Sequence, residues 1–185
     1  AEQIGTRECV TSQFFSGIDT EKERMTLPLL ILLAGGITAA AYGYLIGGVT
    51  AQMMGGATAG LDTIVLLSSV IGAFLGTFIF WVIWAALVYG ISMVFRGSGS
   101  FSGTLKVIGY GYLPQVIGTV ITLIAAFEYV PKIVVPKITS SMMQDPAAVQ
   151  QVTASLMKDP AMVELTQIST LITIVFLLWS ANIWI

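Results

Sequence analysis

The chain has 185 residues, of which 56% are hydrophobic and only 10% are charged, and its formal net charge is −2. A soluble domain carries roughly a quarter charged residues, so this composition excludes an ordinary water-soluble protein. The slight negative charge and the lack of a basic tract also exclude nucleic acid as a partner, because phosphate binding needs clustered Lys and Arg. The lipid bilayer is therefore the expected environment and partner of most of the chain.

Four apolar runs follow one another, each long enough to cross a bilayer, and they predict an all-α integral membrane helical bundle. Short turns join most of the runs, so we expect one transmembrane domain rather than several. The predicted spans are residues 27–49, 63–95, 105–127 and 167–185. The last run is still apolar where the sequence stops; either it just reaches the far interface or, as we favour, the natural chain continues.

Residues 1–26 mix charged side chains with an apolar set that includes Phe14 and Phe15. On a helix these apolar residues share one face, which predicts an interfacial helix whose aromatic rings enter the acyl region. A polar tail without regular structure is the alternative. Trp81 and Trp84 are likewise expected at the membrane interface, where the ring systems have one wet edge.

Small residues recur at helical spacing in the first two spans, and such strips let membrane helices approach closely. The predicted packing residues are Gly35, Ala39, Gly43 and Gly47 in the first span, with Ser68, Gly72 and Gly76 in the second. As a helix the second run would be about 50 Å long, against a hydrocarbon core of about 30 Å. We therefore expect that helix to tilt strongly or to project from the membrane.

The third run contains a proline, which removes one backbone donor and pushes against the preceding carbonyl, so the span should bend there. Polar and glycine residues surround the bend. The candidate functional residues are Gly109, Tyr110, Gly111, Tyr112, Pro114 and Gln115. The bend is either a hinge or plain architecture, and its polar side chains either bond neighbouring helices or line a solute path.

Residues 128–166 form the longest polar segment, predicted as an outer loop, and they contain two Asp-Pro pairs, Asp145-Pro146 and Asp159-Pro160. Aspartate caps free backbone N–H groups and proline suits the first helical position, so two short surface helices are expected. Five of the basic residues fall on the side of the N-terminus and three in this long loop, which favours a cytoplasmic N-terminus.

Ionisable residues are scarce at membrane depth, and histidine is absent from the chain. Asp62, Lys106 and Glu128 sit at predicted span ends, where their charges are expected to reach water. We therefore expect no catalytic residues, no cofactor and no metal site. The leading hypothesis is a non-enzymatic protein that organises membrane or recruits partners, including further copies of itself or other membrane proteins. The alternative is a small-solute or lipid permease or channel that uses the bent third span.

The segment Tyr110–Pro114, in a span that follows a short glycine-rich loop, resembles the Tyr-Gly-Tyr…Pro element of the Yip (Ypt-interacting protein) domain family. Phe14 and Phe15 ahead of the first span are similar to the N-terminal pattern of its prokaryotic members. The resemblance implies a helical membrane protein of about five spans, so that a fifth span is expected to follow the four seen here if the chain is incomplete. It also implies a cytoplasmic N-terminus and the plasma membrane of a prokaryote. Eukaryotic members bind prenylated Rab GTPases in vesicle traffic, so a GTPase partner is implied by analogy alone; the short head here resembles archaeal or bacterial members.

Overall fold

The computed structural model describes residues 25–55 and 62–184. Residues 1–24, which hold Phe14, Phe15 and most of the expected interfacial helix, lie outside the described residues. The described chain is helical and contains no strand. Its elements are α2 (Thr26–Met54), α3 (Asp62–Val94), α4 (Phe101–Gly111), α5 (Leu113–Tyr129), the 3-10 turns η1 (Val130–Lys132) and η2 (Met142–Gln144), α6 (Pro146–Met157) and α7 (Pro160–Trp184).

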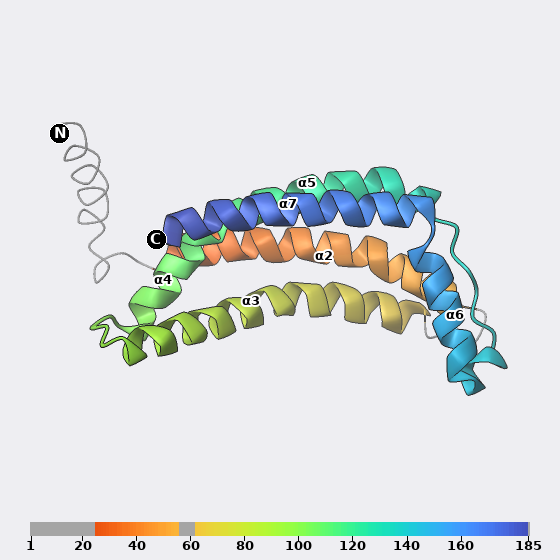
Figure 1. The fold of residues 1–185 in the computed structure, drawn as a ribbon, viewed down its shortest axis with the longest axis horizontal. Helices are drawn as coiled ribbons and strands as arrows, with labels where there is room; N and C mark the ends of the chain where they lie inside the picture. The colour runs from red at the N-terminus through yellow and green to blue at the C-terminus, as the bar shows by residue number, and fades with distance from the viewer. Residues whose placement is uncertain (1–24, 56–61, 185) are drawn as a thin grey trace.

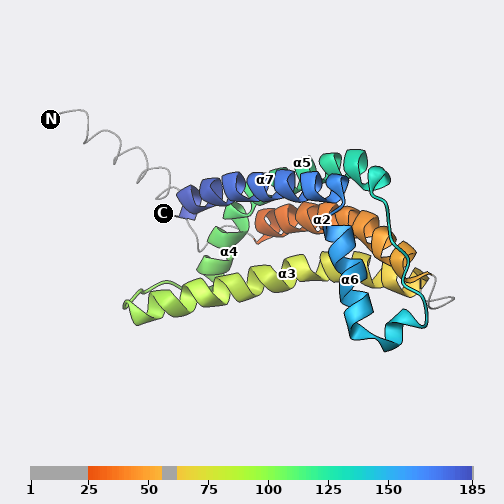
Figure 2. The same cartoon turned by 45° about the vertical axis from the view of Figure 1, so that its right-hand side comes forward.

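The long helices run side by side and give an elongated bundle (Figure 1). Four stretches of the described chain are long and apolar enough to cross a membrane: Thr26–Met54, Asp62–Val94, Phe101–Lys132 and Pro160–Ala181. The predicted all-α membrane bundle with four visible spans is therefore confirmed. Helix α2 contacts α3, α4 and α5, while α7 packs mainly on α5 (Figures 1 and 2).

Helix α3 has 33 residues, or about 50 Å of helix. Its C-terminal end extends past the first turn of α2 (Figures 1 and 2). A Schellman motif ends it: Arg96 has a φ of 60°, and the N–H of Gly97 donates to the carbonyl of Ser92 at 2.8 Å. A Cβ on Gly97 would lie 2.1 Å from Ser92 Oγ and 3.0 Å from the Ser92 carbonyl oxygen, so a larger residue there would force the Ser92 side chain to move.

At the other end of the bundle, the two Asp-Pro pairs start helices of different length. Asp145 caps the short surface helix α6 by accepting from the N–H of Ala147 at 2.9 Å. Asp159 caps α7 itself, accepting from Ala161 and Met162 at 3.0 and 3.2 Å. The prediction of a second short helix is therefore wrong: the helix that contains the last apolar run, α7, already begins at Pro160. The physical reason is that no Gly or Pro interrupts the helix between Pro160 and the apolar run.

Two small cores lie near the two ends of the bundle. Near α4, the buried residues Leu32, Trp81, Ala85 and Ile108 pack together. Near α6, Val49 of α2 packs with Ile133 and Leu156. Most of the remaining apolar side chains stay exposed, as expected for helices that face lipid.

Candidate functional site

The third span is broken where its sequence predicted a bend. Helix α4 ends at Gly111, Tyr112 stands between the helices, and Pro114 lies in the first turn of α5. A proline costs no hydrogen bond in a first turn, because the N–H groups there have no partner within the helix. The axis of α4 is steeply inclined to that of α5 (Figures 1 and 2). The break carries the chain from the end of α3 back into the bundle.

The start of α2 packs against this break through glycines on both partners. A Cβ on Gly109 would lie 2.6 Å from Cβ of Pro28, so only glycine permits this approach. On α2, a Cβ at Gly35 would lie 3.2 Å from Cε1 of Tyr112 and 3.1 Å from Cγ2 of Val116. Gly109 in α4 and Gly35 in α2 therefore serve helix packing. Gly111 is also buried, and Tyr110 is half-buried.

Trp81 does not face the headgroups as predicted. Its side chain is only 7% exposed, and its Nε1–H donates to the carbonyl of Leu105 at 3.1 Å. Because α4 packs against α3, the indole ring is covered by Ile108 and its neighbours in the α4-side core. Trp84, one turn later, is 45% exposed, which suits an interface position.

Lys106 also departs from the prediction, since it was expected to reach water at a span end. The side chain is only 8% exposed. Lys106 lies in the second turn of α4, and this helix packs against both α3 and α2. The folding back of α4 therefore buries a position that the sequence puts at the end of a span.

Gln115 is the polar centre of the site, because it lines two cavities. One, of about 240 Å³, has aromatic and aliphatic walls that include Phe80, Trp84 and Leu177. The other, of about 270 Å³, lies between α2, α5 and α7. Nε2 of Gln115 also lies 3.5 Å from Oγ of Ser180, a fully buried serine of α7.

Hydroxyl groups line the second cavity, which we call the hydroxyl groove. Its lining residues are Tyr42, Gln115, Gly118, Thr119, Thr122, Ser169, Ile172 and Thr173. The serine and threonine hydroxyls donate to carbonyls of their own helices; for example, Thr119 donates to Gln115 at 2.8 Å and Thr173 to Ser169 at 2.7 Å. With their hydrogens engaged, these oxygens offer acceptor lone pairs to the groove.

Sequence reasoning missed this groove, although a signal was present. Ser169 and Thr173 are four residues apart, and so they share one face of a helix. What could not be read was that Thr119 and Thr122 of α5 lie opposite them. The arrangement can form neutral hydrogen bonds, and no charged side chain lines it.

The small-residue strips also differ from the prediction. Gly43 and Gly47 do lie against α3: a Cβ on Gly43 would come 2.8 Å from the carbonyl oxygen of Ser69, and one on Gly47 would come 2.7 Å from its Cβ. Ser69 and Ala73 therefore form the facing strip. Gly72 and Gly76 do not pack there, because added Cβ atoms meet nothing within 4 Å.

The predicted packing strip of the second span, Ser68, Gly72 and Gly76, is therefore displaced by one residue from the strip that faces α2, which contains Ser69 and Ala73. Ser68 is exposed, whereas Ser69 is half-buried. In the first strip, Ala39 is half-buried and Gly35 faces the broken third span instead of α3. Within residues 25–55 and 62–184, no group of three or more His, Cys, Asp or Glu side chains could hold a metal ion.

Four apolar spans, one of them broken and packed through glycine, define a multi-span helical membrane protein. The sequence profile of the Yip1 domain matches residues 10–185, so the chain belongs to the Yip1 domain family. It is 30% identical over 114 residues to an uncharacterised protein of the archaeon Methanocaldococcus jannaschii, covering 62% of this chain and 81% of that protein. No solved structure matches the chain. The resemblance first carried by Tyr110–Pro114 is confirmed.

Proposed function

We propose that this Yip-family protein is a non-enzymatic membrane organiser that acts through the hairpin of α3 and α4. The observation that carries the proposal is the overhang of α3. Its 33 residues make a helix about 20 Å longer than the hydrocarbon core. Its last residue and the residue that follows it are apolar and exposed: Val94 is 79% exposed and Phe95 82% exposed.

Helix α4 supports the overhang from beside it. The rings of Tyr89 and Phe101 meet edge to face with centroids 5.6 Å apart, which ties the start of α4 to the end of α3. Ser100 caps α4 by accepting from the N–H of Gly103 at 3.1 Å, so the helix starts immediately after the turn. An apolar hairpin of this kind is unfavourable in water and most favourable in the headgroup layer.

A hairpin held in the headgroup layer of one leaflet displaces lipid there. Helices that do not match the bilayer thickness also thin it, tilt or associate, and each response changes the membrane around the protein. We therefore attribute both the organisation of the membrane and the recruitment of membrane partners to the overhang of α3. A GTPase partner, a homo-oligomer, and residence in a prokaryotic plasma membrane with a cytoplasmic N-terminus are parts of this proposal, supported by family analogy and by the loop charges.

The test compares the shapes of vesicles that contain wild-type protein or a polar-tip variant, Val94→Asn with Phe95→Asn. At a fixed protein-to-lipid ratio, cryo-electron microscopy should show narrower vesicles with wild type than without protein, and this narrowing should be lost in the variant. Val134→Asn is the matched control, since Val134 is 76% exposed at the opposite end of the bundle. Equal vesicle sizes with wild type and with the polar-tip variant would contradict the proposal.

The hydroxyl groove favours a second candidate, a permease or channel for small neutral solutes or lipids. Gln115 and Thr119 lie in the groove, and their polar atoms could replace part of the hydration of a passing solute. Solute and lipid flux in proteoliposomes would test it, with Gln115→Leu and Thr119→Val as blocking variants and Thr153→Val on the surface helix α6 as control. Flux lost in both blocking variants but kept in the control would support this candidate over the organiser.

A further inference from the structure

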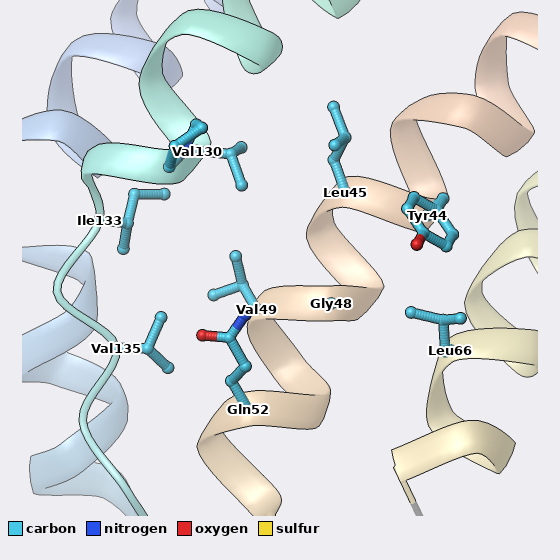
Figure 3. A pocket seen from close by; sticks show the side chains of 10 residues that line it. Tyr44, Leu45, Gly48, Val49, Gln52, Leu66, Val130, Ile133 and Val135 are labelled. Atoms are coloured by element: carbon cyan, nitrogen blue, oxygen red, sulfur yellow. The ribbon is translucent and has the colours of Figure 1, made fainter.

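The α6 end of the bundle holds a groove that neither proposal uses. Its floor is one face of α2, where Tyr44, Gly48 and Gln52 follow one another every four residues. Figure 3 shows Gly48 in the middle of this floor, with Val130, Ile133 and Val135 on one side and Leu66 of α3 on the other. The cavity measures about 290 Å³. It opens over Gly48 because glycine has no side chain there, and an added Cβ would meet nothing within 4 Å.

The wall opposite α3 is fixed in place by hydrogen bonds. The segment that follows η1 is extended, and the N–H of Ile138 donates to the carbonyl of Met53 at 2.8 Å. The N–H of Val134 donates to Oδ2 of Asp159 at 3.2 Å. Ile133 and Ile138 are both buried, 7% and 5% exposed. The groove is therefore a built feature of the fold.

A second cavity, of about 390 Å³, continues the first one toward the end of α2. The two share Gln52 and Val135 in their linings, and the second also includes Asp62 and Lys137. From Tyr44 to Gly55 the combined groove follows α2 for about 16 Å. Its apolar part lies toward the middle of the span, and both its charged residues lie at the mouth.

An apolar groove with charged residues at its mouth has the same order of apolar and charged parts as one phospholipid molecule. Charged side chains at the end of a spanning helix lie at headgroup level, and apolar walls one to two turns deeper lie at the level of the acyl chains. Lys137 offers a cation to a phosphate, and Asp62 offers an anion to an ammonium group. We propose that the groove binds a phospholipid with an amine-bearing headgroup, one acyl chain lying over Gly48 and the headgroup between Lys137 and Asp62.

The test measures lipid binding to the delipidated full chain in detergent by native mass spectrometry, with phosphatidylethanolamine as the probe. Wild type should take up one saturable lipid per chain. Gly48→Phe should weaken it about tenfold, because the ring occupies the space of the acyl chain. Gly72→Phe is the matched control, since Gly72 lies in open space on α3 and outside the groove. Equal lipid binding by the Gly48 and Gly72 variants would overturn the proposal.

The charged mouth gives a second variant that does not depend on core packing. Lys137→Gln combined with Asp62→Asn should abolish any preference for phosphatidylethanolamine over phosphatidylglycerol, whereas Lys158→Gln, at the C-terminal cap of α6, should leave it unchanged. A preference that survives the double change would overturn the headgroup assignment. Glycerophosphoethanolamine has the headgroup without acyl chains and should not compete with the lipid; competition would mean a site for the headgroup alone. Dimers in wild type that Gly48→Phe removes would identify a second copy as the occupant instead.

Discussion

The two ends of the bundle are closed in different ways. At the α4 end, side-chain shape closes the structure: Gly109 meets Pro28, and Trp81 fills the space between α3 and α4. At the α6 end, hydrogen bonds to one carboxylate join two elements: Asp159 accepts from backbone N–H groups of α7 and from the N–H of Val134 in the extended segment. At the α4 end the backbones of α2 and α4 approach closely at Gly109, beside the cavity lined by Gln115, whereas at the α6 end a groove runs along α2 over Gly48. Substitutions at the α4 end should therefore destabilise the protein by overpacking, and substitutions at the α6 end by the loss of hydrogen bonds.

Gly109→Leu should have the largest effect. A Cβ at this position lies 2.6 Å from Pro28 Cβ, so a leucine must push α4 from α2, at a cost of about 3 kcal/mol. Thermal unfolding in detergent, followed by circular dichroism, would show a large fall in midpoint. The same change at Gly76, where an added Cβ meets nothing within 4 Å, should leave the midpoint close to that of wild type. Similar unfolding midpoints for the Gly109 and Gly76 variants would mean that close packing of side chains does not hold the α4 end together.

Asp159→Ala should come second. It removes the cap of α7 and the tie to Val134 together, which should cost about 2 kcal/mol. Asp145→Ala removes one capping bond from the short helix α6 and should cost about 1 kcal/mol or less. The same unfolding assay compares the two Asp-Pro pairs directly. If Asp145→Ala destabilised the protein as much as Asp159→Ala, the special role of Asp159 at the α6 end would be refuted.

Trp81→Phe should have a smaller effect. Phenylalanine keeps most of the ring packing in the α4-side core but cannot donate to the carbonyl of Leu105, a loss of about 1 kcal/mol. Trp179→Phe is the control, because Trp179 is 50% exposed on α7. We expect its unfolding midpoint to match that of wild type. A larger loss at Trp179 than at Trp81 would contradict the assignment of Trp81 to the core.

Lys132→Met should have the smallest effect. Lys132 pairs with Glu128 one turn earlier and lies over the ring of Tyr129 at 5.3 Å, but both charged side chains are more than half exposed. Exposed ion pairs between long side chains contribute little to stability. The unfolding midpoint should not change, at low or at high salt. A fall as large as that of Asp159→Ala would show that the α6 end also depends on this ion pair.

Some features of the site could be predicted because their causes are local. Pro114 lacks an N–H wherever it stands, so a break near it was readable, and the Asp-Pro chemistry marked two helix starts correctly. The second pair, Asp159-Pro160, did not show how long its helix is: α7 continues through the whole last apolar run. Tyr112 and Gln115 were identified as residues of the break, but their neighbours Trp81 and Ser180 come from other parts of the chain.

The sequence by itself determined the membrane class, the four apolar spans, the broken third span and the Yip-family element, because the length and polarity of a run are properties of consecutive residues. Only the tertiary structure decided which side of each helix faces inward. In lipid both faces of a spanning helix are apolar, so the periodicity that marks the buried face of a soluble helix is weak. For this reason Ser69 packs where Ser68 was expected, Lys106 and Trp81 are buried, and the grooves at Gln115 and Gly48 come from helices that the sequence does not connect.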